Sequence, residues 1–270
     1  MKNYDWQIRF HNDFAKKLAN QKSTYLLDAC VGSGKSHAGA NAIKTAFENY
    51  GFTKLLILSP SYLKKIEWME DLAIQGIQIT PRFSNQIEAN LSDYVGVTLT
   101  YQGLTSLDKD KLSWVDKNTL VICDEIHHSS EENSWGEALD TLNGRVGCIL
   151  SLTGTAFRSK SKAGDKIKTV DYVEQNGKTV SKPDFVYTYS EGIRDKTVCP
   201  VVFKKVKGEA EYASGTIYSE KAHKQTECAK VLKAIFEDDD FLTEMLEESL
   251  EQLNQIKLNK PNAALLITVR

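Results

Sequence analysis

A glycine-rich loop that follows an apolar run constrains this chain more than any other feature. Residues 26–36 read Leu-Leu-Asp-Ala-Cys-Val-Gly-Ser-Gly-Lys-Ser, and a segment of helical length, 36–49, comes next. Glycines let backbone N–H groups turn toward phosphate oxygens, and a helix N-terminus adds its partial positive charge. A strand, this loop and a helix in that order predict a phosphate-binding P-loop, although Ala29 stands where the pattern begins with glycine.

Each residue of the loop has an expected role. Lys35 should reach the β- and γ-phosphates, and the Ser36 hydroxyl should bind Mg²⁺. Backbone N–H groups should cradle the phosphates over the whole loop, which consists of Val31, Gly32, Ser33, Gly34, Lys35 and Ser36.

Buried-strand patterns recur through the first half of the chain. Five runs are almost continuously apolar rather than alternating, as in strands covered on both faces; they are 25–29, 55–58, 94–99, 120–123 and 148–152. Segments between them, among them 36–49 and 62–73, are long enough for crossover helices. The series predicts an α/β fold with a parallel sheet flanked by helices.

Two carboxylates follow one of these runs. The apolar segment 119–123 leads into Asp124 and Glu125, and His127 and His128 follow after one residue. At the carboxyl edge of a sheet, Asp124 is expected to hold Mg²⁺ through its water shell and Glu125 to polarise an attacking water. A zinc site is disfavoured, because the histidines have no third ligand at zinc-type spacing.

The loop and the acidic pair together resemble motifs I and II of superfamily 2 helicases of the DExH branch. The resemblance implies a RecA-like lobe with ATP and Mg²⁺ as cofactors. Gln7 resembles the glutamine that reads adenine in that superfamily. Residues 151–158, Ser-Leu-Thr-Gly-Thr-Ala-Phe-Arg, resemble motif III, although Ala156 replaces the usual proline. Coupling of the nucleotide state to nucleic acid is expected from His127, Thr153 and Thr155.

Two further segments resemble the motifs that touch the nucleic-acid backbone. They are 59–63, Ser-Pro-Ser-Tyr-Leu, and 98–104, Thr-Leu-Thr-Tyr-Gln-Gly-Leu. Hydroxyl groups and helix starts suit phosphate oxygens. The expected nucleic-acid track consists of Ser59, Pro60, Thr98, Tyr101 and Gln102, and it implies backbone contacts with little sequence preference.

A narrower resemblance rests on 134–138, 187–195 and the motif III run. These segments are similar to DEAD/DEAH-box helicases with a type III restriction-like ATPase module, and the resemblance covers residues 5–270. The resemblance favours DNA over RNA as the nucleic-acid partner. It also implies other subunits of a defence or repair complex as protein partners. Motifs V and VI, which carry arginine fingers worth about 10³ to 10⁵ in rate, have no counterpart, so the isolated chain should hydrolyse ATP slowly.

The sequence changes character after motif III. Residues 157–208 hold 12 basic and 6 acidic residues, a net charge of 12 − 6 = +6, with β-type pieces at 185–189 and 198–203. Apolar residues at helical spacing between 220 and 258 predict one or two amphipathic helices with an acidic outer face. The run 263–270 has the pattern of another buried strand.

These changes predict three parts. The first is a RecA-like ATP-binding lobe, 1–205, which includes a small basic β-type insertion over 157–205. The second is a helical connector, 206–260. The third is the opening strand of a truncated second RecA-like lobe, 261–270.

Composition adds two limits. Lys and Arg number 34 and Asp and Glu number 36, a net charge of −2, so any nucleic-acid surface must be local. No uncharged apolar stretch approaches the roughly 20 residues that span a bilayer, so we expect a cytoplasmic protein without a membrane partner. The five cysteines lack a C-x-x-C pair, which favours buried reduced thiols.

The function expected from these features is that of an ATP-hydrolysing helicase or translocase acting on nucleic acid. Two alternatives stay open. A phosphotransferase or kinase-type P-loop enzyme would share the phosphate loop without needing the track. A P-loop nucleotide switch, or a translocase subunit of a restriction or defence complex, would act through a partner chain.

Overall fold

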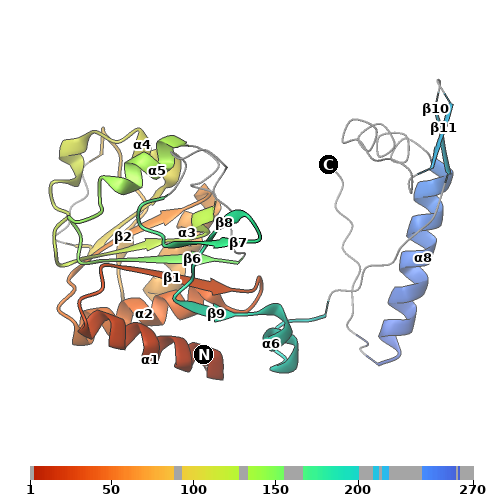
Figure 1. Cartoon of the computed structure of the whole chain (residues 1–270), viewed down its shortest axis with the longest axis horizontal. Helices are drawn as coiled ribbons and strands as arrows, with labels where there is room; N and C mark the ends of the chain where they lie inside the picture. The colour runs from red at the N-terminus through yellow and green to blue at the C-terminus, as the bar shows by residue number, and fades with distance from the viewer. Residues whose placement is uncertain are drawn as a thin grey trace. The chain divides into compact units, whose positions relative to one another are not determined.

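The computed structural model in Figure 1 describes residues 3–87, 93–127, 133–154, 167–200, 209–212, 215–218, 239–259 and 261. The chain divides into two compact units, 1–200 and 201–270. The first unit contains the central sheet and the helices that cover it.

The central sheet has seven strands in the order β3-β4-β2-β5-β6-β1-β9, and every neighbouring pair is parallel. The strands are β1 Thr24–Ala29, β2 Lys54–Ser59, β3 Ile79–Thr80, β4 Gly96–Thr100, β5 Thr119–Cys123, β6 Cys148–Thr153 and β9 Phe185–Tyr187. All five strands predicted from apolar runs are confirmed. The α/β fold class is confirmed with them.

Helices cover both faces of the sheet (Figure 1). One face carries α1 Asp5–Ala19, α2 Lys35–Asn49 and α3 Tyr62–Ile74; the other carries α4 Tyr101–Thr105, the 3₁₀ helix Lys109–Leu112 and α5 Asn133–Asp140. Successive side chains of a strand point to opposite faces. In β2, Leu55 and Ile57 therefore pack on the first face, and Leu56 and Leu58 on the second. This is why the strand sequences are continuously apolar.

Part of the predicted basic insertion belongs to the central sheet. The β-type piece 185–189 contains β9, which pairs with β1 and is followed by the short helix α6 Tyr189–Arg194. The insertion also has an antiparallel hairpin of β7 Tyr172–Gln175 and β8 Lys178–Ser181.

The strand predicted over 198–203 is wrong in its described part. Residues 198–200 are not in a strand, because the chain turns back after α6 and the N–H groups of Thr197 and Val198 donate to the carbonyl of Gly192. Residues 201–203 lie outside the described residues.

The second unit contains an antiparallel hairpin, β10 Glu209–Tyr212 with β11 Gly215–Tyr218, and the helix α8 Asp239–Lys257. The helix agrees with the amphipathic pattern predicted between 220 and 258. The hairpin lies within the predicted helical connector, 206–260. The strand predicted over 263–270 lies outside the described residues, and the domain boundaries stay predictions.

Three of the cysteines, Cys30, Cys123 and Cys148, are buried free thiols as expected, whereas Cys199 is exposed. Cys228 lies outside the described residues. In the part of the chain that the structure describes, no helix combines the length and the apolar character that a bilayer crossing requires.

Candidate nucleotide-binding site

The glycine-rich loop joins β1 to α2, as predicted. Gly32 and Gly34 have φ angles of 79° and 89°, which strongly favour glycine, and Gly34 is the N-cap of α2. The Ser33 hydroxyl donates to the carbonyl of Cys30 at 2.6 Å and closes the turn. The loop therefore brings backbone N–H groups to the N-terminus of a long helix, an arrangement that favours anions.

Asp124 and Glu125 follow β5 at the carboxyl edge of the sheet. The Asp124 side chain is buried, and its Oδ2 accepts a hydrogen bond from the Trp68 indole N–H at 2.9 Å. Its backbone carbonyl accepts from the Tyr101 hydroxyl at 2.9 Å. Burial raises the pKa of the Asp124 carboxyl above its ordinary value, and the Trp68 hydrogen bond acts in the opposite direction.

Glu125 connects three of the predicted motifs. Its Oε1 lies 3.5 Å from Lys35 Nζ, and its Oε2 accepts from the backbone N–H of Gly154 at 3.2 Å. His127 Nδ1 lies 3.4 Å from the same Oε2 and 3.0 Å from Thr153 Oγ1. The P-loop, the acidic strand end and motif III thus meet on one carboxylate.

Gly154 leaves space beside Lys35 and Val31 because glycine has no side chain. A Cβ built on Gly154 would lie 3.0 Å from both Lys35 Nζ and Val31 Cγ2. Among the described residues, no group of three or more His, Cys, Asp and Glu side chains could hold a metal by itself. Mg²⁺ bound with phosphates and water needs only one or two carboxylates, so this set of residues is compatible with a nucleotide that carries Mg²⁺.

Asp28 is a third carboxylate of this region that the sequence analysis missed. It lies in β1, in register with Thr153 of β6. Burial raises the pKa of Asp28, the Lys35 charge lowers it and the Glu125 charge raises it. Its position within a predicted apolar strand is a signal that could have drawn attention to it.

Gln7 lies against the P-loop rather than at the surface. Its Nε2 donates to the carbonyl of Gly34 at 3.1 Å, and its Oε1 accepts from the N–H of Tyr4 at 2.9 Å. It is thus a brace between the start of α1 and the loop. Its predicted reading of adenine stays a prediction.

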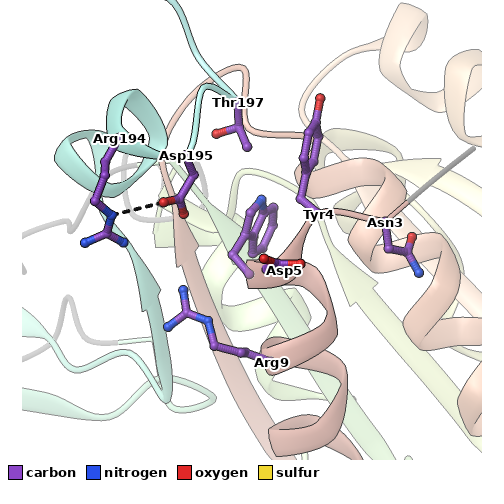
Figure 2. A pocket seen from close by; sticks show the side chains of 8 residues that line it. Asn3, Tyr4, Asp5, Arg9, Arg194, Asp195 and Thr197 are labelled. Atoms are coloured by element: carbon purple, nitrogen blue, oxygen red, sulfur yellow. Dashed lines mark hydrogen bonds and ion pairs between the residues drawn. The ribbon is translucent and has the colours of Figure 1, made fainter.

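A pocket of about 680 Å³ adjoins this brace. Figure 2 shows Tyr4, Asp5 and Arg9 from the start of the chain facing Arg194, Asp195 and Thr197. The Arg194 Nε donates to Asp195 Oδ1 at 3.0 Å. Sequence reasoning missed this pocket, because its two walls come from distant segments that only the pairing of β9 with β1 brings together.

The predicted nucleic-acid track needs a correction. The side chains of Ser59, Thr98 and Tyr101 are buried, so they are not available for direct contacts with phosphates. Pro60 is half-buried and Gln102 is exposed, and their role in the track stays a prediction. The predicted coupling residue Thr155 lies outside the described residues, as does His128.

Exposed side chains at the carboxyl edge of the sheet come from the starts of two helices. Ser61 caps α3 and Thr100 caps α4, each accepting a backbone N–H with its hydroxyl. Tyr62 and Leu63, at the first turn of α3, are 66% and 74% exposed.

A parallel sheet with a P-loop and an Asp-Glu pair at its carboxyl edge defines a P-loop ATPase lobe of RecA-like fold. Comparison with known families narrows this class. The family described as "Type III restriction enzyme, res subunit" matches residues 1–158, more than half of the chain. The chain belongs to this family and is a helicase-family ATPase module.

Two mycobacterial relatives match over most of the chain. An uncharacterized protein of Mycobacterium leprae (strain TN) is 32% identical over 209 residues, which are 77% of this chain and 34% of the relative. An uncharacterized protein of Mycobacterium tuberculosis (strain CDC 1551 / Oshkosh) is 26% identical over 266 residues, 96% of this chain and 43% of the relative. The chain therefore spans less than half the length of these curated relatives.

Among solved structures, the SWI2/SNF2 ATPase core of Sulfolobus solfataricus in complex with dsDNA is similar in fold. The TM-score is 0.50 at 20% sequence identity, over 61% of this chain and 34% of that chain.

Proposed function

We propose that this chain is the ATP-binding lobe of an ATP-hydrolysing helicase or translocase that acts on nucleic acid, with DNA favoured over RNA. The observation that carries the proposal is the contact of Glu125 with Lys35, Gly154 and His127. It joins the P-loop, the acidic strand end and motif III at one point. A phosphate-binding enzyme that lacked a nucleic-acid partner would not need the third of these segments.

Each residue of the site has a proposed role in hydrolysis. The backbone of 31–36 and the Lys35 ammonium bind the phosphates, while Ser36 and Asp124 hold Mg²⁺, the latter through water. When bound, Mg²⁺ would supply positive charge that neutralises the phosphates. Arrival of the phosphates draws Lys35 away from Glu125, which leaves Oε1 of Glu125 free to accept a proton from water.

The base and sugar of the nucleotide are proposed to enter the pocket beside Gln7. The half-exposed Tyr4 ring offers a stacking surface, and the Thr197 hydroxyl and the Asp195 carboxylate offer hydrogen-bond partners. The pocket adjoins the loop through the bond from Gln7 to Gly34. A nucleotide whose phosphates bind at the loop is therefore proposed to extend toward this pocket.

The nucleic-acid track is proposed at the carboxyl edge of β2 and β4. The first turns of α3 and α4 offer helix N-termini, which favour phosphate oxygens. Pro60 and Gln102 lie there, with Tyr62 and Leu63 exposed beside them. The Sulfolobus ATPase core of similar fold was solved in complex with dsDNA, which supports DNA as the partner.

The test compares ATP hydrolysis with and without single- and double-stranded DNA and RNA. Three proteins are needed: this chain, a longer version with a complete second lobe, and that version with Glu125→Gln. We expect strong stimulation by DNA in the longer, unmutated protein alone. Hydrolysis that does not respond to either nucleic acid would instead favour a phosphotransferase-like P-loop enzyme.

The family match supports a second candidate, a motor subunit within a restriction or defence complex. Its name describes one subunit of an enzyme. In that case the longer protein should gain nucleic-acid-stimulated hydrolysis only when its partner chain is added. Full stimulation of the longer protein alone would exclude this candidate.

A further inference from the structure

Trp68 connects a helix at the proposed track to the acidic strand end. It lies in α3 and is 1% exposed. Its indole N–H donates to Asp124 Oδ2 at 2.9 Å, and Asp124 is itself 2% exposed. Hydrogen bonds to a buried carboxylate are stronger than those between neutral groups. This bond therefore fixes the orientation of the Asp124 carboxylate.

The Trp68 ring is held in place from its other side by α2. A Cβ built on Gly39 would lie 2.8 Å from Trp68 Cη2 and 3.2 Å from Leu152 Cδ1. The helix that begins at the P-loop can therefore pack directly on the ring. Trp68 thus lies between the P-loop helix, the central sheet and Asp124.

Asp124 is held at two points by helices that start at the same edge of the sheet. Trp68 of α3 binds its carboxylate, whereas Tyr101 of α4 binds its backbone carbonyl at 2.9 Å. The two bonds differ in consequence. The Tyr101 bond fixes the main chain, and only the Trp68 bond decides which way the carboxylate oxygens face.

We propose that Trp68 is a positioning residue that orients the Asp124 carboxylate to receive hydrated Mg²⁺ and so links α3 to the metal site. The inference rests on the proposed function, because it assumes that Asp124 holds Mg²⁺ in the nucleotide-bound protein. Trp68 acts through Asp124 and does not itself touch the nucleotide or the metal.

The decisive variant is Trp68→Phe, which removes the indole N–H and keeps a buried aromatic ring. Trp114→Phe is the matched control. The Trp114 indole N–H is buried without a hydrogen-bond partner in the structure. The backbone carbonyl of Trp114 accepts a hydrogen bond from Lys54, which lies at the start of β2. This is the opposite end of the sheet from Asp124.

Binding of a fluorescent ATP analogue to the 270-residue chain is measured across a Mg²⁺ titration and in EDTA. Loss of a residue that orients a metal ligand typically weakens the metal about tenfold or more. We expect Trp68→Phe to need about tenfold more Mg²⁺ for half-maximal binding, with unchanged affinity in EDTA. Trp114→Phe should match the unmutated chain in both conditions.

Two results would overturn the inference. One is an unchanged Mg²⁺ requirement in Trp68→Phe. The other is an equal loss of affinity with and without Mg²⁺, which would mean that the ring only supports the packing of the P-loop helix. Failure of the unmutated chain to bind the analogue would instead reject the proposed function itself.

A second measurement does not depend on the folding of the variant. The chain has four tryptophans, so its indole N–H groups give four signals in a nitrogen–proton correlation spectrum. The Trp68 signal should shift when ATP and Mg²⁺ are added together and stay in place with ATP in EDTA, while the Trp114 signal stays in place throughout. A Trp68 signal that ignores Mg²⁺ would contradict the proposal.

Discussion

At the scale of single residues, the site is organised around the Glu125 carboxylate and its partners. Glu125 has a backbone φ of 48°, a conformation that is uncommon for residues other than glycine. Its carboxylate takes the Lys35 ammonium as its partner. A strained residue held by its surroundings is typical of functional sites. The arrangement indicates that binding and hydrolysis can be separated by single substitutions.

Glu125→Gln should separate them. The amide keeps the shape of the side chain but cannot accept a proton from water, so hydrolysis by the longer protein should fall about 10²- to 10⁴-fold. ATP affinity should stay the same or rise, because Lys35 no longer has a competing partner. Steady-state hydrolysis and equilibrium binding measure the two effects. Glu48→Gln, at an exposed ion pair of α2, is the control, and a parallel loss of binding would contradict the assignment.

Asp28→Asn should stabilise the fold at neutral pH. Burial raises the pKa of Asp28 in the folded chain, so its charge costs stability once the pH rises through that pKa. The gain should be largest near pH 7 and shrink as the pH falls toward about 3.9, the ordinary pKa of aspartate. Chemical denaturation at several pH values measures it.

Asp116→Asn supplies a control of opposite sign. The hydrogen bond from Lys54 holds the pKa of Asp116 below its ordinary value. The Asp116 charge therefore favours the folded state at pH values above about 3.9, the ordinary pKa of aspartate. The substitution should not increase stability at pH 7. A gain in both variants would mean that the effect of Asp28 is only that of removing net charge.

At the scale of elements, close packing between α2 and α3 determines where the two halves of the site lie. Aromatic residues fix the neighbouring helix α1 in a similar way. Phe14 packs edge-on against Tyr25 of β1. Trp6 stacks on Tyr187 of β9, with 4.7 Å between the ring centroids. The same β9 begins the turn into α6 and so builds the wall of the pocket beside Gln7. Helix packing therefore assembles both ends of the proposed nucleotide site.

Gly39→Ala should weaken the packing of α2 on α3. Alanine gains about 1 kcal/mol of helix propensity over glycine, but the new Cβ would meet the Trp68 ring at 2.8 Å. Overpacking of a well-filled core costs about 1 to 3 kcal/mol, so we expect a net loss of up to about 2 kcal/mol. Urea unfolding measures it, with the exposed Lys44→Ala on the same helix as control. A more stable Gly39→Ala protein would show that the ring can move aside.

At the scale of the whole molecule, the described site residues belong to the first unit. Both hydrophobic clusters lie within residues 6–187, and the P-loop, the acidic pair and the pocket lie within 1–200. The proposed nucleotide site therefore lies in a unit with its own core.

A shortened chain of residues 1–200 should fold and bind ATP with the affinity of the full 270 residues. A domain with its own core can fold independently. Circular dichroism on heating and binding of a fluorescent ATP analogue test this expectation. Loss of the cooperative transition, or a fall in affinity above about tenfold, would mean that residues 201–270 contribute to the site.

The local patterns of the sequence determined the fold class and the places of the glycine-rich loop and the acidic strand end. Five apolar runs identified five of the seven central strands, because a strand covered on both faces has no polar alternation to obscure it. The loop 26–36 and the pair of Asp124 and Glu125 were recognisable because their chemistry depends on adjacent residues. The short β3 was missed, since a strand of two residues carries too little pattern. The β-type piece 185–189 was recognised, but its pairing with β1 in the central sheet was not.

Contacts between distant segments were decided only by the tertiary structure. The sequence does not show that Trp68 reaches Asp124, that Gln7 braces Gly34, or that α6 forms a wall beside Tyr4. It placed Ser59, Thr98 and Tyr101 on the expected nucleic-acid track, although the structure buries their side chains. Periodicity reports which face of an element is apolar, whereas the order of the strands and the packing of the helices determine which faces meet.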